Sequence, residues 1–189
     1  ARVLEVGYGS GILLPELAGE LGVSRKLLSR SLRLLEDAFL LHRLYNYSRS
    51  ARKTQRKLKK YYPAFPSIDL LFREDPHSRS RVLEWLLVTQ LDAEFFWRDA
   101  AKNEVDIVLR TDPPLPIEVK LSRPDTRGLV VFLRKFQCPR GILVTESEPG
   151  SSLPDGINAI SAWKLLLDPP SSKPLPQPPS GGTPRSRLP

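Results

Sequence analysis

Apolar positions in the first part of the chain recur with the spacing of α-helices. Leu14, Leu17, Ala18 and Leu21 lie on one side of a predicted helix over residues 14–21. Gly22 ends this helix, and Ser24 is a good N-cap for a second helix over residues 25–38, in which leucines repeat at helical spacing. Residues 39–47 are rich in aromatic and β-favouring side chains, which predicts a strand. This order is typical of a winged helix-turn-helix.

The pattern changes in the second part of the chain, where short β-type runs alternate with two longer helical stripes. Residues 78–91 and 127–136 have the helical spacing, and residues 141–145 form a continuous apolar run typical of a buried strand. Further strands are predicted over residues 94–97, 103–109, 117–120 and 157–160, and a short helix over residues 162–167. We therefore predict an α/β (α+β) fold whose second part has the order α-β-β-β-α-β.

Two of these strands carry acidic side chains and are joined by a turn. Residues 103–109 alternate polar and apolar positions, so that Glu104, Asp106 and Val108 are expected on one face. The connector over residues 110–116 contains Asp112-Pro113-Pro114, which forces a chain reversal. The returning strand places Glu118 and Lys120 on one face. Two carboxylates beside an ammonium can hold a hard divalent cation and position a water near a phosphate; the alternative is a solvated hairpin with incidental ion pairs.

The order Trp97-Arg98-Asp99, Asn103-Glu104-Val105-Asp106 and Ile117-Glu118-Val119-Lys120 resembles the PD-(D/E)xK nuclease core. It is similar to the nuclease-like C-terminal domain of a family of prokaryotic AAA-type ATPases. The resemblance implies that Asp106 and Glu118 hold Mg²⁺ or Mn²⁺, and that Lys120 orients the attacking water or stabilises charge on the phosphate. It also implies that Glu84, on the preceding helix, is a further metal ligand and completes the catalytic set. The family commonly has Glu-Asn at that position, whereas this chain has Glu84-Trp85.

The first part of the chain resembles the winged-helix unit that precedes the nuclease-like domain in the same ATPases. The segment that carries this resemblance reads LAxxLGVSRKLLSRSLRLLEDAFLL, and the two resemblances together cover roughly residues 12–168. The ATPase module would lie before residue 1, so no ATP binding is predicted for the chain itself. Because the chain starts with Ala1 and contains no Met, we expect it to be a fragment or a processed product.

Charge is distributed unevenly along the 189 residues, whose net charge is +8. Residues 1–62 contain 13 Lys/Arg against 5 Asp/Glu, whereas residues 63–168 contain 13 against 16. A single-signed basic segment after a helix-turn-helix favours phosphate contact over a merely solvated loop, and DNA is the expected partner. The residues that this interpretation assigns to nucleic-acid binding are Arg25, Lys26, Arg30, Arg43, Arg49, Arg52, Lys53, Arg56, Lys57, Lys59 and Lys60.

Composition restricts the remaining choices. Cys138 is the only cysteine, so a disulfide within the chain is excluded and a reducing cytoplasm is the simplest location. No apolar run approaches the roughly 20 residues that span a bilayer, so no membrane contact is expected. Eight of the residues in 169–189 are proline, and this segment is expected to be disordered. The predicted organisation is a winged helix-turn-helix over 1–62, a nuclease-like domain over 63–168 and a tail over 169–189.

Two function classes follow from these observations. The first is a metal-dependent phosphodiesterase that binds and cleaves DNA. The second is a catalytically silent module that binds DNA, docks on its ATPase module, or mediates association of identical chains. The fold itself does not distinguish them, whereas the approach of Asp106 to Glu118 does, since a shared metal requires the two carboxylates to lie together.

Overall fold

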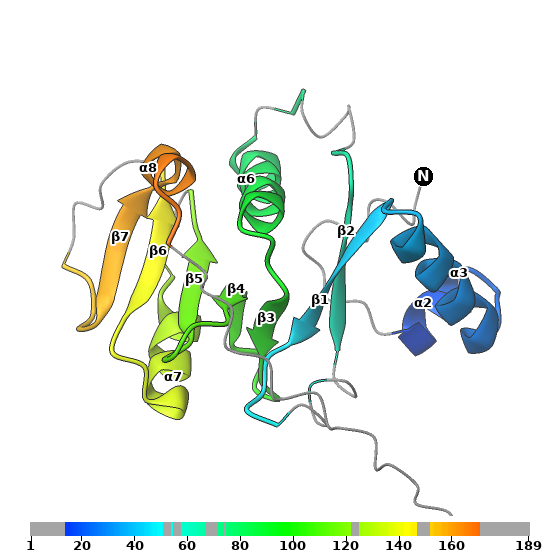
Figure 1. Ribbon diagram of the computed structural model, residues 1–189, viewed down its shortest axis with the longest axis horizontal. Coiled ribbons are helices and arrows are strands. Elements are labelled where there is room, and N and C mark those ends of the chain that lie inside the picture. Colours follow the sequence, from blue (N-terminus) through cyan, green and yellow to red (C-terminus); the bar gives the residue numbers. More distant parts are fainter. Residues whose placement is uncertain are drawn as a thin grey trace, which may run out of the picture.

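A mixed sheet of seven strands, in the order β2-β1-β3-β4-β5-β6-β7, runs through the molecule (Figure 1). The computed structural model describes residues 14–50, 54, 58–66, 72–73, 75–121, 125–146 and 152–170. The lead-in before residue 14 and most of the Pro-rich tail lie outside the described residues, as do residues 67–71 of a short helix that the sequence predicts over residues 67–72. The prediction of a mixed α/β fold is confirmed.

The first elements are two helices followed by an antiparallel strand pair. They are α2 (Leu14–Glu20), α3 (Arg25–Asp37), β1 (Leu41–Asn46) and β2 (Lys59–Pro63). Gly22 has φ +64°, a backbone conformation that suits glycine at the end of a helix. The Ser24 hydroxyl accepts a hydrogen bond from the Leu27 amide at 3.2 Å and so caps α3, as its position predicted.

The remaining elements begin with a long helix and contain five strands. They are α6 (Pro76–Gln90), β3 (Phe95–Arg98), β4 (Glu104–Leu109), β5 (Leu115–Val119), α7 (Arg127–Phe136), β6 (Gly141–Thr145), β7 (Ile157–Ser161) and α8 (Ala162–Leu167). From α6 to β6 the order is α-β-β-β-α-β, as the sequence predicted. The carboxylate of Asp75 caps α6 by accepting a hydrogen bond from the Ser78 amide at 2.9 Å. Pro76 follows in the first turn of the helix, where the backbone N–H that proline lacks would have no partner within the helix.

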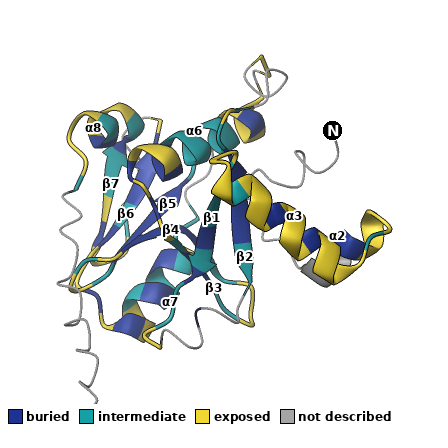
Figure 2. Cartoon of the chain, turned by 45° about the vertical axis from the view of Figure 1, so that its right-hand side comes forward, coloured by how far each residue is buried: buried dark blue, intermediate teal, exposed yellow. Residues whose placement is uncertain are grey.

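Helices cover both faces of the sheet and create two separate cores. On one face, α6 and α8 bury Leu87, Val88 and Leu165 against apolar side chains of β4 and β5. On the other face, α7 buries Leu129 and Phe132 against Trp97 and neighbouring residues. A third, smaller cluster joins α2 and α3 to Tyr61 and Leu41, while much of α3 stays exposed (Figure 2).

The expected first unit is joined to the second through the sheet itself. Strand β1 pairs in parallel with β3, with Tyr45 opposite Phe95 and Asn46 opposite Phe96. The boundary expected at residue 62 falls inside β2, and the side chains of Leu44 and Tyr62 belong to the same core as α6. Strand β2 is an edge strand of the sheet and ends at Pro63, in keeping with the confinement of proline to edge strands.

The face pattern of β4 differs from strict alternation. Phe95 lies opposite Val108 and Trp97 opposite Val105, so β4 has one residue more than β3 between these pairs. Such a bulge moves the following side chains to the other face. Glu104 and Asp106 share the α6 face, as expected, but Val108 packs in the α7 core instead, which corrects its sequence-based placement.

Candidate active site

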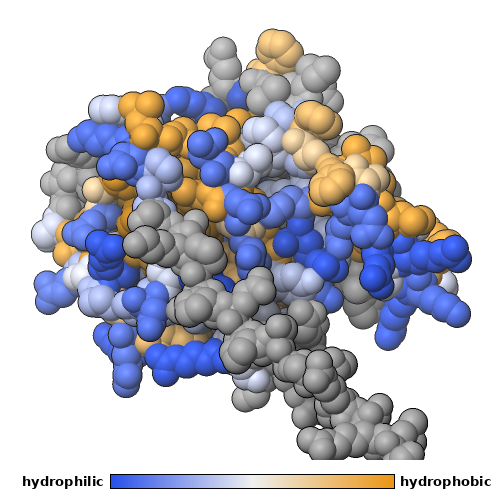
Figure 3. All heavy atoms as spheres, in the orientation of Figure 1, coloured by the Kyte–Doolittle hydropathy of each residue, from blue (hydrophilic) through white to orange (hydrophobic). Residues whose placement is uncertain are grey.

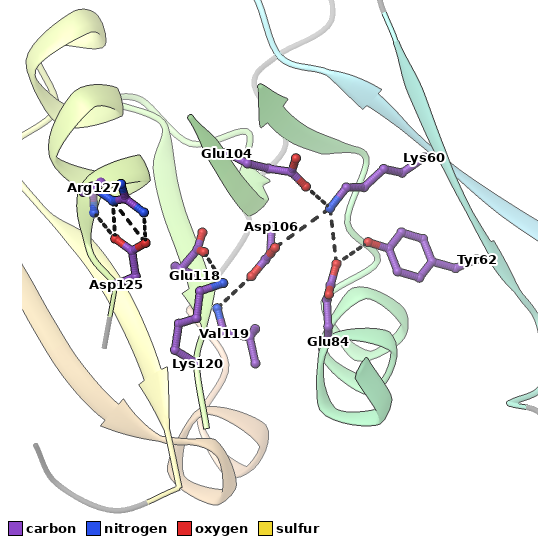
Figure 4. A network of polar contacts seen from close by, with 10 residues as sticks. All are labelled: Lys60, Tyr62, Glu84, Glu104, Asp106, Glu118, Val119, Lys120, Asp125 and Arg127. Carbon is purple, nitrogen blue, oxygen red and sulfur yellow. Dashed lines mark hydrogen bonds and ion pairs between the residues drawn. The ribbon is translucent and has the colours of Figure 1, made fainter. Parts of the chain in front are cut away.

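Asp106 and Glu118 meet where β4 and β5 separate. The ladder between the two strands pairs Ile107 with Ile117, and the next step in this register places Asp106 opposite Glu118. There the backbone pairing is replaced by a side chain, because Asp106 Oδ2 accepts a hydrogen bond from the Val119 amide at 2.9 Å (Figure 4). The sequence prediction that the hairpin brings these two carboxylates together is confirmed.

Lys120 directly follows β5 and completes the acidic hairpin. Its ammonium lies 2.6 Å from Glu118 Oε1, and its amide donates to the Val144 carbonyl of β6 at 2.9 Å, which fixes its backbone. Burial lowers the pKa of Lys120, but Asp106 and Glu118 outweigh this effect and raise the pKa above its ordinary value. The two carboxylates therefore favour the protonated, cationic form of Lys120.

Both hairpin carboxyls resist ionisation. Burial raises the pKa of Asp106 to about 6, together with the nearby Glu84 and against the opposing effect of Lys60 and Lys120. Burial also raises the pKa of Glu118 well above its ordinary value, and the charge of Asp106 adds to this effect. The charge of Asp106 therefore lies close enough to Glu118 to disfavour its ionisation.

Glu84 faces the same cluster from α6 but is engaged by protein groups. Its Oε1 accepts a hydrogen bond from the Tyr62 hydroxyl at 2.6 Å and lies 3.4 Å from the Lys60 ammonium. Tyr62 was not predicted as a site residue, because the sequence pattern does not show whether a tyrosine in a strand packs only in the core or also donates a hydrogen bond from its hydroxyl.

Lys60 is the largest correction to the sequence interpretation. It was assigned to an exposed nucleic-acid surface, but its side chain is 1% exposed and its ammonium lies 2.6 Å from Glu104 Oε1. The same ammonium is 3.9 Å from Asp106 Oδ1. Burial by itself lowers the pKa of Lys60, but Tyr62 and the carboxylates of Glu84, Asp106 and Glu104 raise it well above its ordinary value. Lys60 belongs to the acidic cluster because a buried ammonium requires such partners.

The other predicted nucleic-acid residues fall into three groups. Arg25, Lys26, Arg30 and Arg49 are exposed, and the Arg49 guanidinium also donates to the Phe136 carbonyl at 2.7 Å. Arg43 and Lys59 are partly buried, with Arg43 paired to Glu36 at 3.0 Å. Arg52, Lys53, Arg56 and Lys57 lie outside the described residues.

The charge balance of the cluster is suited to a divalent cation. Four carboxyl groups (Glu84, Glu104, Asp106 and Glu118) surround two ammonium groups, so the cluster has two negative charges in excess when all four are ionised, as they would be around a bound cation. Arg98 offsets part of the Glu104 charge from the solvent side, at 3.5 Å. In addition, Glu118 Oε2 is buried and has no hydrogen-bond partner among the described residues. A buried carboxylate oxygen without a partner is costly unless another group satisfies it.

The number of ligands is also compatible with magnesium. Within the described residues, no three His, Cys, Asp or Glu side chains are grouped closely enough to enclose a metal ion by themselves. Mg²⁺, however, usually keeps several waters and takes only one or two carboxylates from the protein. Asp106 and Glu118 therefore fit Mg²⁺ or Mn²⁺ as a pair, whereas the third ligand predicted at Glu84 is bound to Tyr62 and Lys60.

Comparison with known families gives two matches of uncharacterised function. Residues 82–165 match the domain of unknown function DUF4143, a domain found in C-terminal regions of AAA ATPases. Residues 9–66 match a second domain of unknown function, DUF8612. The first match contains Glu84, Asp106, Glu118 and Lys120, whereas Lys60 and Tyr62 lie in the second. No curated protein and no solved structure matches the chain. No helix in the described part of the chain is both long enough and apolar enough to cross a membrane.

Proposed function

We propose that the chain is a metal-dependent phosphodiesterase of the PD-(D/E)xK type that acts on DNA. The observation that supports this proposal most is the pair Asp106–Glu118, which combines raised pKa values with a buried, unpartnered oxygen at Glu118. A purely structural ion-pair cluster would be expected to satisfy that oxygen with a protein donor. The match to DUF4143 is in keeping with a place in the C-terminal part of an AAA-type ATPase.

The residues of the hairpin have distinct roles in this proposal. Asp106 and Glu118 hold Mg²⁺ or Mn²⁺, and the Val119 amide keeps the Asp106 carboxylate oriented. A bound divalent cation would supply a water of lowered pKa and polarise a phosphoryl oxygen. Lys120 remains protonated and stabilises negative charge on the phosphate from the side of Glu118. Glu84 acts through Lys60 and Tyr62, which hold its carboxylate beside Asp106.

The helix pair supplies the proposed DNA contact. Arg25, Lys26 and Arg30 are exposed on α3, as the winged helix-turn-helix interpretation requires of phosphate-binding side chains. Hydrophilic side chains face solvent in the region of α2 and α3 (Figure 3).

A second candidate function rests on the apolar side chains of the same helix. Leu27 and Leu34 of α3 are 52% and 60% exposed, and their spacing places them on one face with Arg30. Exposed leucines between basic residues favour a surface that docks on protein, such as an ATPase module or an identical chain. In that case the chain would be a catalytically silent docking module.

A cleavage assay separates the two functions. Supercoiled plasmid and single-stranded DNA are incubated with the full chain and Mg²⁺, Mn²⁺ or EDTA, together with the variants Asp106→Asn and Lys120→Ala. We expect metal-dependent cleavage in the wild type, no cleavage in EDTA, and strong loss in both variants. Arg140→Ala, an exposed change outside the cluster, serves as the control and should cleave normally. Absence of cleavage in the wild type with every metal and substrate would favour the docking module.

A further inference from the structure

Strand β2 inserts one buried cation, Lys60, into the acidic cluster. Its ammonium lies 2.6 Å from Glu104 Oε1, 3.4 Å from Glu84 Oε1 and 3.9 Å from Asp106 Oδ1. The ring of Phe96 lies beneath it, with its centroid 5.3 Å away. Figure 4 shows the Lys60 side chain reaching the point at which the three carboxylates converge. Lys60 thus occupies a place where a cation is electrostatically favoured.

The position of Lys60 depends on how β2 is held. As an edge strand, β2 pairs with β1 alone. Hydrogen bonds also join β2 to α6: the Tyr62 hydroxyl donates to Glu84, and the Trp85 indole donates to the Pro63 carbonyl at 2.8 Å. The opposite face of β2 carries Tyr61, which packs against α2 and α3. Because Lys60 and Tyr61 are consecutive residues of β2, a shift of this strand would affect both the acidic cluster and the packing of α2 and α3.

Lys60 and a divalent cation would share a carboxylate. Asp106 is one proposed metal ligand and is also one of the three acidic partners of Lys60. Two positive groups a few ångströms apart in a buried site repel each other far more strongly than in water. Lys60 lies closer to Glu104 and Glu84 than to Asp106, so its ammonium can move away from Asp106 and keep these two partners.

We infer that Lys60 is a resident counter-ion of the acidic cluster, and that a divalent cation bound at Asp106 and Glu118 displaces its ammonium from Asp106. This inference rests on the proposed function, because it requires the metal site. Binding linkage makes the effect reciprocal: cation binding loosens the attachment of β2 to α6, and a change at α2 and α3 that moves β2 alters the affinity for the cation. The N-terminal helices would in this way regulate the site.

The first test measures Mn²⁺ affinity by titration calorimetry on the full chain. Lys60→Met removes the ammonium and keeps an apolar side chain of similar length, and Lys59→Met is the matched control because Lys59 contacts the ring of Tyr45 instead of the cluster. We expect Lys60→Met to bind Mn²⁺ at least about tenfold more tightly than the wild type, and Lys59→Met to bind like the wild type. Equal affinities of Lys60→Met and the wild type would overturn the inference.

The second test needs no variant, and so does not depend on the folding of Lys60→Met. Lysine acylation of the wild type is followed by mass spectrometry, with and without saturating Mn²⁺. We expect labelling of Lys60 to increase several-fold with Mn²⁺ and labelling of Lys59 to stay constant. Unchanged Lys60 labelling at saturation would contradict displacement while leaving the metal site intact. If neither the wild type nor Lys60→Met binds Mn²⁺, the proposed function and the inference both fail.

Discussion

Gly128 lies directly against the backbone carbonyl of Glu104. A Cβ at this position would collide with the Glu104 carbonyl oxygen, so the first turn of α7 and the start of β4 are close enough for glycine alone. Glu104 and Asp106 project from that start of β4. The position of the acidic hairpin therefore depends on a glycine in a helix that contributes no side chain to the site.

Replacing Gly128 with alanine should be strongly destabilising. The backbone at Glu104 must shift to accommodate the methyl group, and we expect a loss of about 2–4 kcal/mol in the free energy of unfolding. Urea denaturation measures this quantity. Gly19→Ala is the control, because Gly19 is exposed in α2 with nothing within 4 Å of a new Cβ. That variant should be stabilised by about 0.5–1 kcal/mol, and equal effects at the two glycines would contradict this account.

Tyr62→Phe tests the hydrogen bond that holds Glu84. The buried hydroxyl donates to Glu84 Oε1 at 2.6 Å, and a buried carboxylate that loses a donor is left partly unsatisfied. We expect the free energy of unfolding to fall by about 1–3 kcal/mol, as is usual for a hydrogen bond to a charged group. The half-buried Tyr45 donates no hydrogen bond from its hydroxyl to a described residue, so Tyr45→Phe should change stability by less than about 0.5 kcal/mol.

The raised pKa of Asp106 predicts an unusual pH dependence of stability. The folded value of about 6 lies above the ordinary 3.8, so the folded protein binds this proton more tightly than the unfolded chain. The stabilising contribution is complete below pH 4 and is lost as the pH rises towards 6. In metal-free buffer, Asp106→Asn should therefore flatten the stability profile between pH 4 and 6, and should be more stable than the wild type at pH 7 by about 1–3 kcal/mol.

Asp125 offers a comparison of opposite sign. Hydrogen bonds from Arg127 lower the pKa of Asp125 to about 2, so its contribution is present above pH 4 and lost as the pH falls towards 2. The Asp125–Arg127 pair is largely exposed, so this effect should be small because of solvent screening.

The prediction for Asp106 would be contradicted if the free energy of unfolding of Asp106→Asn kept the wild-type slope between pH 4 and 6.

The proposed DNA contact can be tested through its salt dependence. A variant in which Arg25, Lys26 and Arg30 are replaced by Ala should bind duplex DNA more weakly, and its binding should depend less steeply on salt concentration because fewer counterions are released. Lys60→Met should keep the wild-type salt dependence, because its ammonium is buried. Fluorescence anisotropy over a range of salt concentrations measures both effects. A wild-type salt dependence in the triple variant would place the contact elsewhere.

The acidic hairpin could be predicted from sequence because its signals are local. Alternating polarity defined the two strands, the prolines defined the reversal, and the register then brought Asp106 opposite Glu118. The face of Val108 could not be predicted, because a bulge depends on how β4 pairs with β3 and not on the pattern within β4. Gly128 gave no signal either, since its close contact is with a residue 24 positions earlier in the chain.

The role of Lys60 could not be predicted from the sequence for a different reason. Within a run of basic residues, every lysine contributes equally to a count of charge, and burial is what distinguishes them. The relevant pattern was nevertheless present: Lys60 and Tyr62 occupy alternate positions of a strand, and both face α6. Recognising this required knowing that β2 lies beside α6, which is a property of the tertiary fold. The Trp85 indole supports this arrangement by donating a hydrogen bond to the Pro63 carbonyl.

The most direct test of the account is the number of Mn²⁺ ions bound per chain, measured by electron paramagnetic resonance on the wild type, Asp106→Asn and Glu118→Gln. We predict one bound Mn²⁺ per wild-type chain and a decrease in affinity of at least about tenfold in each variant. Asp112→Asn, an exposed acidic position in the connector between β4 and β5, should bind like the wild type. No binding by the wild type, or equal binding by the wild type and both site variants, would show that Asp106 and Glu118 do not form a metal site.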